Sequence, residues 1–208
     1  MVQDSAYSQH TGVILSAASL TLQRGYRVLL KDFDFTLNPG DGVSLRGANG
    51  VGKTTLLRAL AGLHVPMAGQ VTGSDNGDGP PHISFLGHQD PVKAGEKLRD
   101  QLAFWMRLAG KTGNSDDIVT QLGLVRQLDL AGGVLSAGQR RRVSLARLLI
   151  EDRPIWLLDE PAAPLDSAGR ELLGQVLDQH RAKGGMFVAA VHDDLPGAAT
   201  RTIRLDAA

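Results

Sequence analysis

The residues best suited to chemistry stand in one run of glycines, a lysine and two threonines. Its spacing is G-x-x-x-x-G-K-[ST], and its members are Gly47, Ala48, Asn49, Gly50, Val51, Gly52, Lys53, Thr54 and Thr55. Glycines allow a tight turn whose backbone N–H groups converge on an anion. In such a loop Lys53 reaches the β- and γ-phosphates, and the Thr54 hydroxyl is a ligand for Mg²⁺. The run therefore predicts a triphosphate-binding loop.

The elements beside this loop are the ones that such a loop needs. A short strand is expected at residues 42–46, and a helix is expected over residues 54–60. The positive end of that helix would face the phosphates. The alternative, a glycine-rich surface turn, requires neither element.

Two adjacent carboxylates follow a second apolar stretch. Residues 155–158 read Ile-Trp-Leu-Leu, as in a strand buried on both faces of a parallel sheet, and Asp159-Glu160 comes next. Ligands of open α/β sheets bind at the carboxyl ends of strands. Asp159 is therefore predicted to hold Mg²⁺, and Glu160 to act as a general base on the attacking water. The alternative for this pair alone is an exposed acidic turn.

Composition narrows the possible functions. The 208 residues fit a single domain over residues 1–208, with residues 1–11 as a loose tail. Basic and acidic residues balance at 22 each, so no overall field attracts nucleic acid, and no nucleic-acid partner is expected. Cysteine is absent, and no apolar run has the 18 or so residues that a membrane helix needs. Any membrane role is therefore expected to act through a partner.

Five further stretches, in chain order, resemble motifs of the ATP-binding cassette (ABC) ATPase family. Gln89 resembles the glutamine of the family's Q-loop, and His192 resembles its switch histidine. Residues 158–161 resemble the Walker B motif with its catalytic glutamate, and residues 162–166 resemble the D-loop. The remaining stretch resembles the signature L-S-G-G-Q, and it reads Leu135, Ser136, Ala137, Gly138 and Gln139.

The resemblance implies roles for these residues. It implies ATP and Mg²⁺ as ligands, with Gln89 contacting Mg²⁺ and the attacking water, and with His192 near the γ-phosphate. It also implies a head-to-tail homodimer in which Ser136, Gly138 and Gln139 contact the ATP held by the other subunit. Ser136 is independently a credible N-cap for a helix that ends near Glu151.

The family's fold and setting follow as expectations. The fold class is an α/β P-loop NTPase with an antiparallel β subdomain and a RecA-like parallel core, which together take residues 12–90 and 153–208. Residues 91–152 are expected to form an inserted helical subdomain. The resemblance implies a peripheral ATPase at the cytoplasmic face of the inner membrane that powers a separate integral membrane subunit. Within the family, residues 86–89 and 135–143 resemble the haem exporters of cytochrome c maturation. The alternatives are another small exporter cassette and a soluble ABC ATPase.

Several residues keep more than one interpretation. Tyr26 is either the aromatic residue that stacks on adenine or an ordinary strand-edge tyrosine, and the usual position for that aromatic falls closer to Arg24. The run 140–142 is Arg-Arg-Arg, which predicts a solvated helix face or a contact beside the nucleotide rather than a nucleic-acid site. His88 is undecided. Four other histidines are expected at the surface, namely His10, His64, His82 and His180.

The segment 94–133 has helical periodicity. Its apolar stripe is predicted to pack in the core, and the stripe consists of Leu98, Leu102, Trp105 and Leu108.

Overall fold

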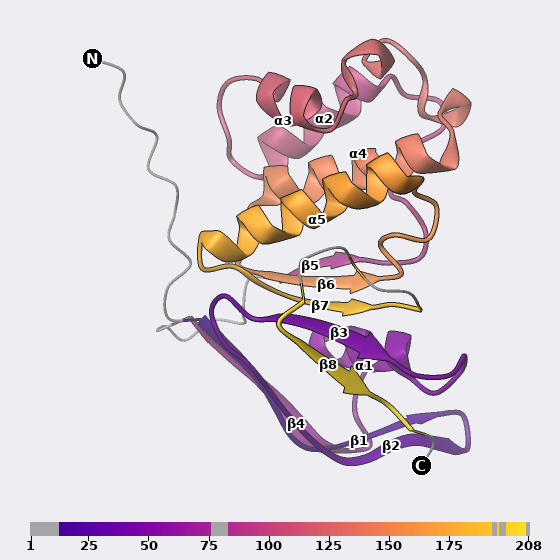
Figure 1. Cartoon of the computed structure of the whole chain (residues 1–208), viewed down its shortest axis with the longest axis vertical. Coiled ribbons are helices and arrows are strands. Elements are labelled where there is room, and N and C mark those ends of the chain that lie inside the picture. Colours follow the sequence, from indigo (N-terminus) through magenta and orange to yellow (C-terminus); the bar gives the residue numbers. More distant parts are fainter. Residues whose placement is uncertain (1–12, 76–82, 193–194, 196–198, 207–208) are drawn as a thin grey trace.

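Two β-sheets of different kinds organise the chain (Figure 1). The computed structural model describes residues 13–75, 83–192, 195 and 199–206. An antiparallel sheet has the order β2-β1-β4, formed by β1 (Val13–Arg24), β2 (Arg27–Leu37) and β4 (Ala68–Asp75). A parallel sheet has the order β5-β6-β7-β3-β8, formed by β3 (Gly42–Arg46), β5 (Ile83–Leu86), β6 (Ile155–Asp159), β7 (Met186–Ala190) and β8 (Arg201–Arg204).

Helices lie on both sides of the parallel sheet. They are α1 (Lys53–Leu60), α2 (Leu98–Leu108), α3 (Asp116–Gln121), α4 (Ala137–Glu151) and α5 (Ser167–Ala182), with short 3-10 turns η1 (Val125–Gln127) and η2 (Gly132–Val134). In Figure 1, α4 and α5 lie along one face of this sheet, with α2 and α3 beyond them. The other face is covered by α1 and the antiparallel sheet.

The central strands are buried on both faces, as predicted for residues 155–158. Every residue of β6 and β7 is buried. Because side chains alternate along a strand, Trp156 and Leu158 enter the core that contains α4 and α5, whereas Ile155 and Leu157 enter the core that contains α1. This double burial fixes where the carboxyl ends of β6 and β7 lie. The predicted combination of an antiparallel sheet, a parallel core and helices is confirmed.

The helical segment differs from the prediction in detail. This segment contains α2, α3, η1 and η2. Leu98 and Leu102 are buried, but Trp105 is only partly buried and Leu108 is 75% exposed. Leu108 is the last residue of α2, and Gly110, with a φ of 67°, turns the chain away just after it. The helix end therefore leaves Leu108 at the surface. Among the described residues, no helix has both the length and the apolar character needed to cross a bilayer.

The prediction for His180 is wrong. This side chain is 5% exposed, and its ring stacks on Trp156 with 3.8 Å between ring centroids and 8° between ring planes. Its Nε2 lies 3.3 Å from the carbonyl oxygen of Met186. Gly185 makes the space, because a Cβ built there would lie 2.3 Å from the His180 ring. The structure leaves His64 partly buried, while His10, His82 and the tail at residues 1–11 lie outside the described residues.

Candidate functional site

The glycine-rich loop joins β3 to α1, as predicted, and its glycines are structurally required. Gly47 has a φ of 149°, and a Cβ built on it would lie 2.5 Å from the carbonyl oxygen of Leu205. Gly52 caps α1 with a φ of 118°, and its Cβ would lie 3.2 Å from Leu29. No side chain fits at Gly47 without moving the backbone, so the tight path of the loop depends on this glycine.

Lys53 is held over this loop. Its side chain is in the first turn of α1 and is only 7% exposed. Its Nζ donates to the carbonyl oxygens of Gly47, at 2.7 Å, and of Ala48, at 3.1 Å. Both acceptors are neutral, and a phosphate oxygen would be a stronger, charged acceptor at the same place. The ammonium is therefore positioned to bind an anion that enters the loop.

Thr54 and Asp159 meet although they are distant in the sequence. The Thr54 hydroxyl donates to Oδ2 of Asp159 at 2.9 Å, and Asp159 is 4% exposed at the end of β6. A hydroxyl and a carboxylate are hard oxygen ligands of the type that Mg²⁺ prefers. Across the ranges that the structure describes, no group of three or more histidines and carboxylates could hold a metal by itself. The pair thus fits Mg²⁺ shared with phosphate oxygens and water, the usual arrangement for this ion.

Glu160 follows directly and adopts a left-handed backbone, with a φ of 47°. Its N–H donates to the carbonyl oxygen of Ala190 at the end of β7. Its carboxylate lies between two imidazoles, with His192 Nε2 2.9 Å from Oε1 and His88 Nδ1 3.7 Å from Oε2. The prediction left His88 undecided, and the structure brings it beside the predicted base. These groups can accept and pass on a proton at one spot.

Gln89 borders a hollow of about 580 Å³ that Thr54 and Asp159 also line. The loop after β5 carries Gln89, and the side chain is exposed. The predicted Mg²⁺ ligands therefore share one concave surface.

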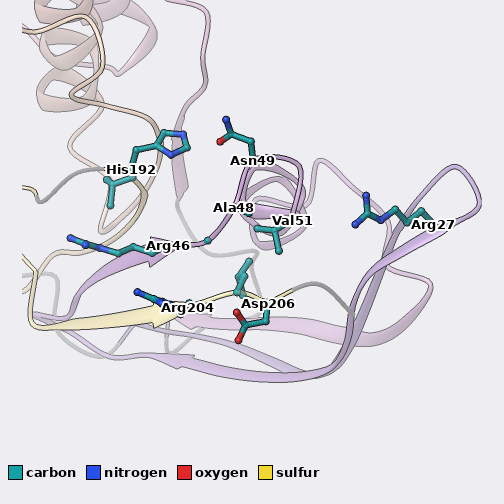
Figure 2. Close-up of a pocket in the computed structure, with 11 residues that line it drawn as sticks. Arg27, Arg46, Ala48, Asn49, Val51, His192, Arg204 and Asp206 are labelled. Carbon is teal, nitrogen blue, oxygen red and sulfur yellow. The ribbon is translucent and has the colours of Figure 1, made fainter.

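A second hollow, of about 400 Å³, borders the loop (Figure 2). Loop residues line it together with His192, and the arginines at its edge are Arg27, Arg46 and Arg204. Among the described residues that line it, Asp206 is the only acidic one. Its positive character suits a polyphosphate.

Tyr26 does not line either hollow. It lies in the turn between β1 and β2 and is fully exposed, whereas its neighbour Arg27 lines the second hollow. The stacking role of Tyr26 therefore stays a prediction. Arg27 was not predicted, and nothing in its sequence neighbourhood distinguishes it from a solvated arginine.

The signature run begins α4 and stays apart from both hollows. Ser136 is the N-cap, and its Oγ accepts from the N–H of Gln139 at 3.2 Å. In return, Gln139 Oε1 accepts from the N–H of Ser136 at 2.8 Å, which completes a capping box. Gly138 lies close to the loop before α5, since a Cβ there would be 3.2 Å from the carbonyl oxygen of Pro164. Ser136, Gly138 and Gln139 line neither hollow.

Arg141 is buried, although it belongs to the run of three arginines at residues 140–142. The run was predicted to form a solvated face or a contact beside the nucleotide. At 2% exposure Arg141 is not on a solvated face, and it lines neither hollow. Its guanidinium donates to the carbonyl oxygens of Gly87 and Glu160 and pairs with Asp90 at 3.1 Å. Burial lowers the pKa of Arg141, and the nearby carboxylates, Asp90 first, oppose that shift.

The helical periodicity of α4 could have predicted that Arg141 is buried. Leu145 and Leu148 stand four and seven residues after Arg141, so the three share one face of α4, and both leucines are fully buried. By contrast, Arg140 and Arg142 are partly exposed, and Arg142 pairs with Asp166 at 3.5 Å.

Comparisons with known proteins agree with these motifs. A model of the ABC transporter family matches residues 30–163. The chain is 47% identical over 183 residues to the cytochrome c biogenesis ATP-binding export protein CcmA of Hyphomonas neptunium, covering 88% of this chain and 92% of the relative. It is 41% identical to the protein of the same name from Rhodopseudomonas palustris (strain BisB5), covering 93% and 98% of the respective chains. Among solved structures, the dimeric ATP-binding cassette MJ0796, bound to ADP and phosphate, is 24% identical, with a TM-score of 0.79 over 92% of this chain and 94% of that one. That last likeness concerns the fold.

Proposed function

This chain belongs to the ABC transporter family, and from that premise we propose that it binds ATP with Mg²⁺ and hydrolyses the ATP to power an export system. The observation that carries the proposal is the meeting of Thr54 with Asp159 at 2.9 Å, next to the buried Lys53 and to Glu160. These groups come from α1 and from the end of β6, and they supply together what triphosphate cleavage requires.

Each side chain has a defined part in the proposed reaction. Lys53 binds the β- and γ-phosphate oxygens with a full positive charge, and loop N–H groups bind the rest of the triphosphate. Bound Mg²⁺, held by Thr54, Asp159 and Gln89, would neutralise charge on the phosphates. Glu160 takes a proton from the attacking water as the water oxygen bonds to the γ-phosphorus and the bond to the bridging oxygen breaks. His192, 2.9 Å from Glu160, would orient that carboxylate and contact the γ-phosphate.

We propose a head-to-tail homodimer as the working form. Ser136, Gly138 and Gln139 are absent from the lining of both hollows beside the phosphate loop, so contact between this run and a bound triphosphate calls for a second copy. The N-terminal end of α4 offers N–H groups and a partial positive charge to such a phosphate. Because each helix end carries only about half a charge, Lys53 should dominate binding and the signature run should dominate closure.

The proposed export system is that of cytochrome c biogenesis, with haem as the transported group. The support is the name shared by relatives at 47% and 41% identity over most of this chain. In this proposal an integral membrane subunit binds the chain at the cytoplasmic face of the inner membrane, where the chain is peripheral. Residues 91–152 would form the helical subdomain that contacts this subunit, with residues 12–90 and 153–208 as the ATP-binding part.

Purification from detergent-solubilised membranes tests the proposal. We expect an integral membrane subunit to co-purify with the full chain, and we expect cells that carry only the Lys53→Ala variant to lose mature c-type cytochromes. A membrane partner with normal cytochromes would favour another small exporter cassette. Recovery without any membrane partner would favour a soluble ABC ATPase.

A further inference from the structure

A single buried guanidinium joins α4 to two segments that carry proposed catalytic groups. The side chain is that of Arg141, in the second turn of α4 and 2% exposed. It donates from one terminal nitrogen to the carbonyl oxygen of Gly87 at 3.1 Å and pairs through the same nitrogen with Asp90 Oδ1, also at 3.1 Å. Its other terminal nitrogen donates to the carbonyl oxygen of Glu160 at 3.2 Å.

The contacts with Gly87 and Asp90 hold both ends of a short loop. Between these two residues stand His88, which faces Glu160, and Gln89, which lines the hollow beside Thr54 and Asp159. Asp90 has a second fixed contact, because Ser144 Oγ, one turn along α4, donates to the same Oδ1 at 2.8 Å. The loop with His88 and Gln89 is therefore fastened to α4 at its two ends.

The contact with Glu160 fixes the backbone that aims the predicted base. A non-glycine residue at a φ of 47° is unfavourable unless its surroundings impose it. The surroundings here are the carbonyl of Ala190, which accepts the Glu160 N–H at 3.0 Å, and Arg141, which donates to the Glu160 carbonyl. Loss of either contact would allow the peptide to rotate, and the carboxylate would then move away from His192.

We propose that Arg141 is a positioning residue for ATP hydrolysis, which aligns Glu160 with the His88–Gln89 loop and leaves nucleotide binding to the separate Lys53 loop. The inference rests on the proposed ATPase function and adds a residue to it. Arg141 contacts neither hollow, so it acts through Glu160 and not on the nucleotide. Since α4 begins at the signature run, the same guanidinium also ties the position of that run to the base in its own subunit.

The charge and the shape of the guanidinium both matter to this role. A glutamine at this position cannot reach the same acceptors and leaves Asp90 without its cation. A lysine keeps the charge but carries its donors on one nitrogen, so it cannot hold Asp90 and the Glu160 carbonyl in the geometry of a planar fork.

The test uses the full-length chain and compares Arg141→Gln, Arg141→Lys and the control Arg99→Gln. Arg99 is an exposed arginine of α2 that pairs with Asp129 at 2.6 Å, and it lies outside the proposed machinery. We expect kcat to fall about 10²-fold in Arg141→Gln, the scale of a misaligned catalytic group, and by about tenfold in Arg141→Lys. KM and the Kd for ATP should stay within about threefold of wild type in both, as expected when only the chemical step is damaged. The control should keep the wild-type kcat.

A double-variant cycle separates positioning from a purely structural role. Because Arg141 holds the backbone of Glu160, most of the loss caused by Arg141→Gln should disappear in a Glu160→Gln background, and only the part that comes through the His88–Gln89 loop should remain. Multiplied losses would overturn the proposal, as would a kcat within about threefold of wild type in a folded Arg141→Gln. Should that variant not fold, an unchanged kcat in Arg141→Lys overturns it instead. If the wild-type chain cleaved no ATP, the proposed ATPase function itself would be rejected. That outcome is distinct from the outcomes that overturn only the role of Arg141.

Discussion

Replacing Glu160 by glutamine isolates the proposed base from every other part of the site. Glutamine has nearly the same size as glutamate. It keeps an oxygen that can accept a hydrogen bond from His192, whose Nε2 lies 2.9 Å from Oε1 of Glu160 in the structure. The backbone contacts of Glu160 with Ala190 and Arg141 do not involve the changed atoms. The folded structure should therefore lose little stability, less than about 1 kcal/mol.

The expected loss of rate follows from the role of the carboxylate. A positioned general base contributes about 10²- to 10⁴-fold to a rate, which corresponds to about 2.7–5.5 kcal/mol of activation free energy. An amide cannot take the proton from water. ATP affinity should be retained, because the substitution leaves Lys53 and the glycine-rich loop unchanged.

Single-turnover cleavage of ATP and size exclusion in the presence of ATP provide the assay. We expect Glu160→Gln to bind ATP with normal affinity, to cleave it at least about 10²-fold more slowly and to elute as a dimer, because the closed form is not released by hydrolysis. Cleavage within about tenfold of the wild-type rate would refute the assignment of the base. Elution only as a monomer would count against the proposed dimer.

The remaining predictions concern binding, closure and stability. Lys53→Ala should reduce turnover at least about 10²-fold, the scale of one lost transition-state donor, and near-normal ATPase activity would reject the phosphate-loop assignment. Ser136→Ala should lower stability by about 1 kcal/mol through loss of the cap and should slow turnover without weakening ATP binding to the monomer, so weakened monomer binding would contradict it. Gly185→Ala should destabilise by about 2–4 kcal/mol, because its Cβ displaces the ring of His180 from its stack, and thermal unfolding measures this loss. Gly95→Ala is the matched control, since a Cβ there meets nothing within 4 Å, and equal effects of the two changes would contradict the steric explanation.

Much of this site is local in sequence and could be predicted from it. The glycine-rich loop is a continuous run whose backbone conformation depends on residues within the run, and the strand before it and the helix after it are short-range patterns. The same holds for Ser136 and Gln139, whose capping box spans a single helical turn. The continuous apolar character of residues 155–158 likewise predicted a strand buried on both faces, which β6 confirms.

Other contacts between distant segments, however, were decided by the tertiary structure alone. The sequence contains no sign that His88 would face Glu160, because that contact depends on the order of β5 and β6 in the sheet. The burial of His180 depends on Trp156 and on the space left at Gly185.

The position of Arg141 depends partly on the sequence pattern and partly on the tertiary structure. The sequence by itself determined that position 141 falls on the apolar face of α4, because helical periodicity is a property of neighbouring residues. Only the tertiary structure decided that a charge could be buried there, because its partners come from the segment after β5 and from the end of β6. An isolated buried charge is unfavourable, and the carbonyls and carboxylate that compensate it are brought together by folding.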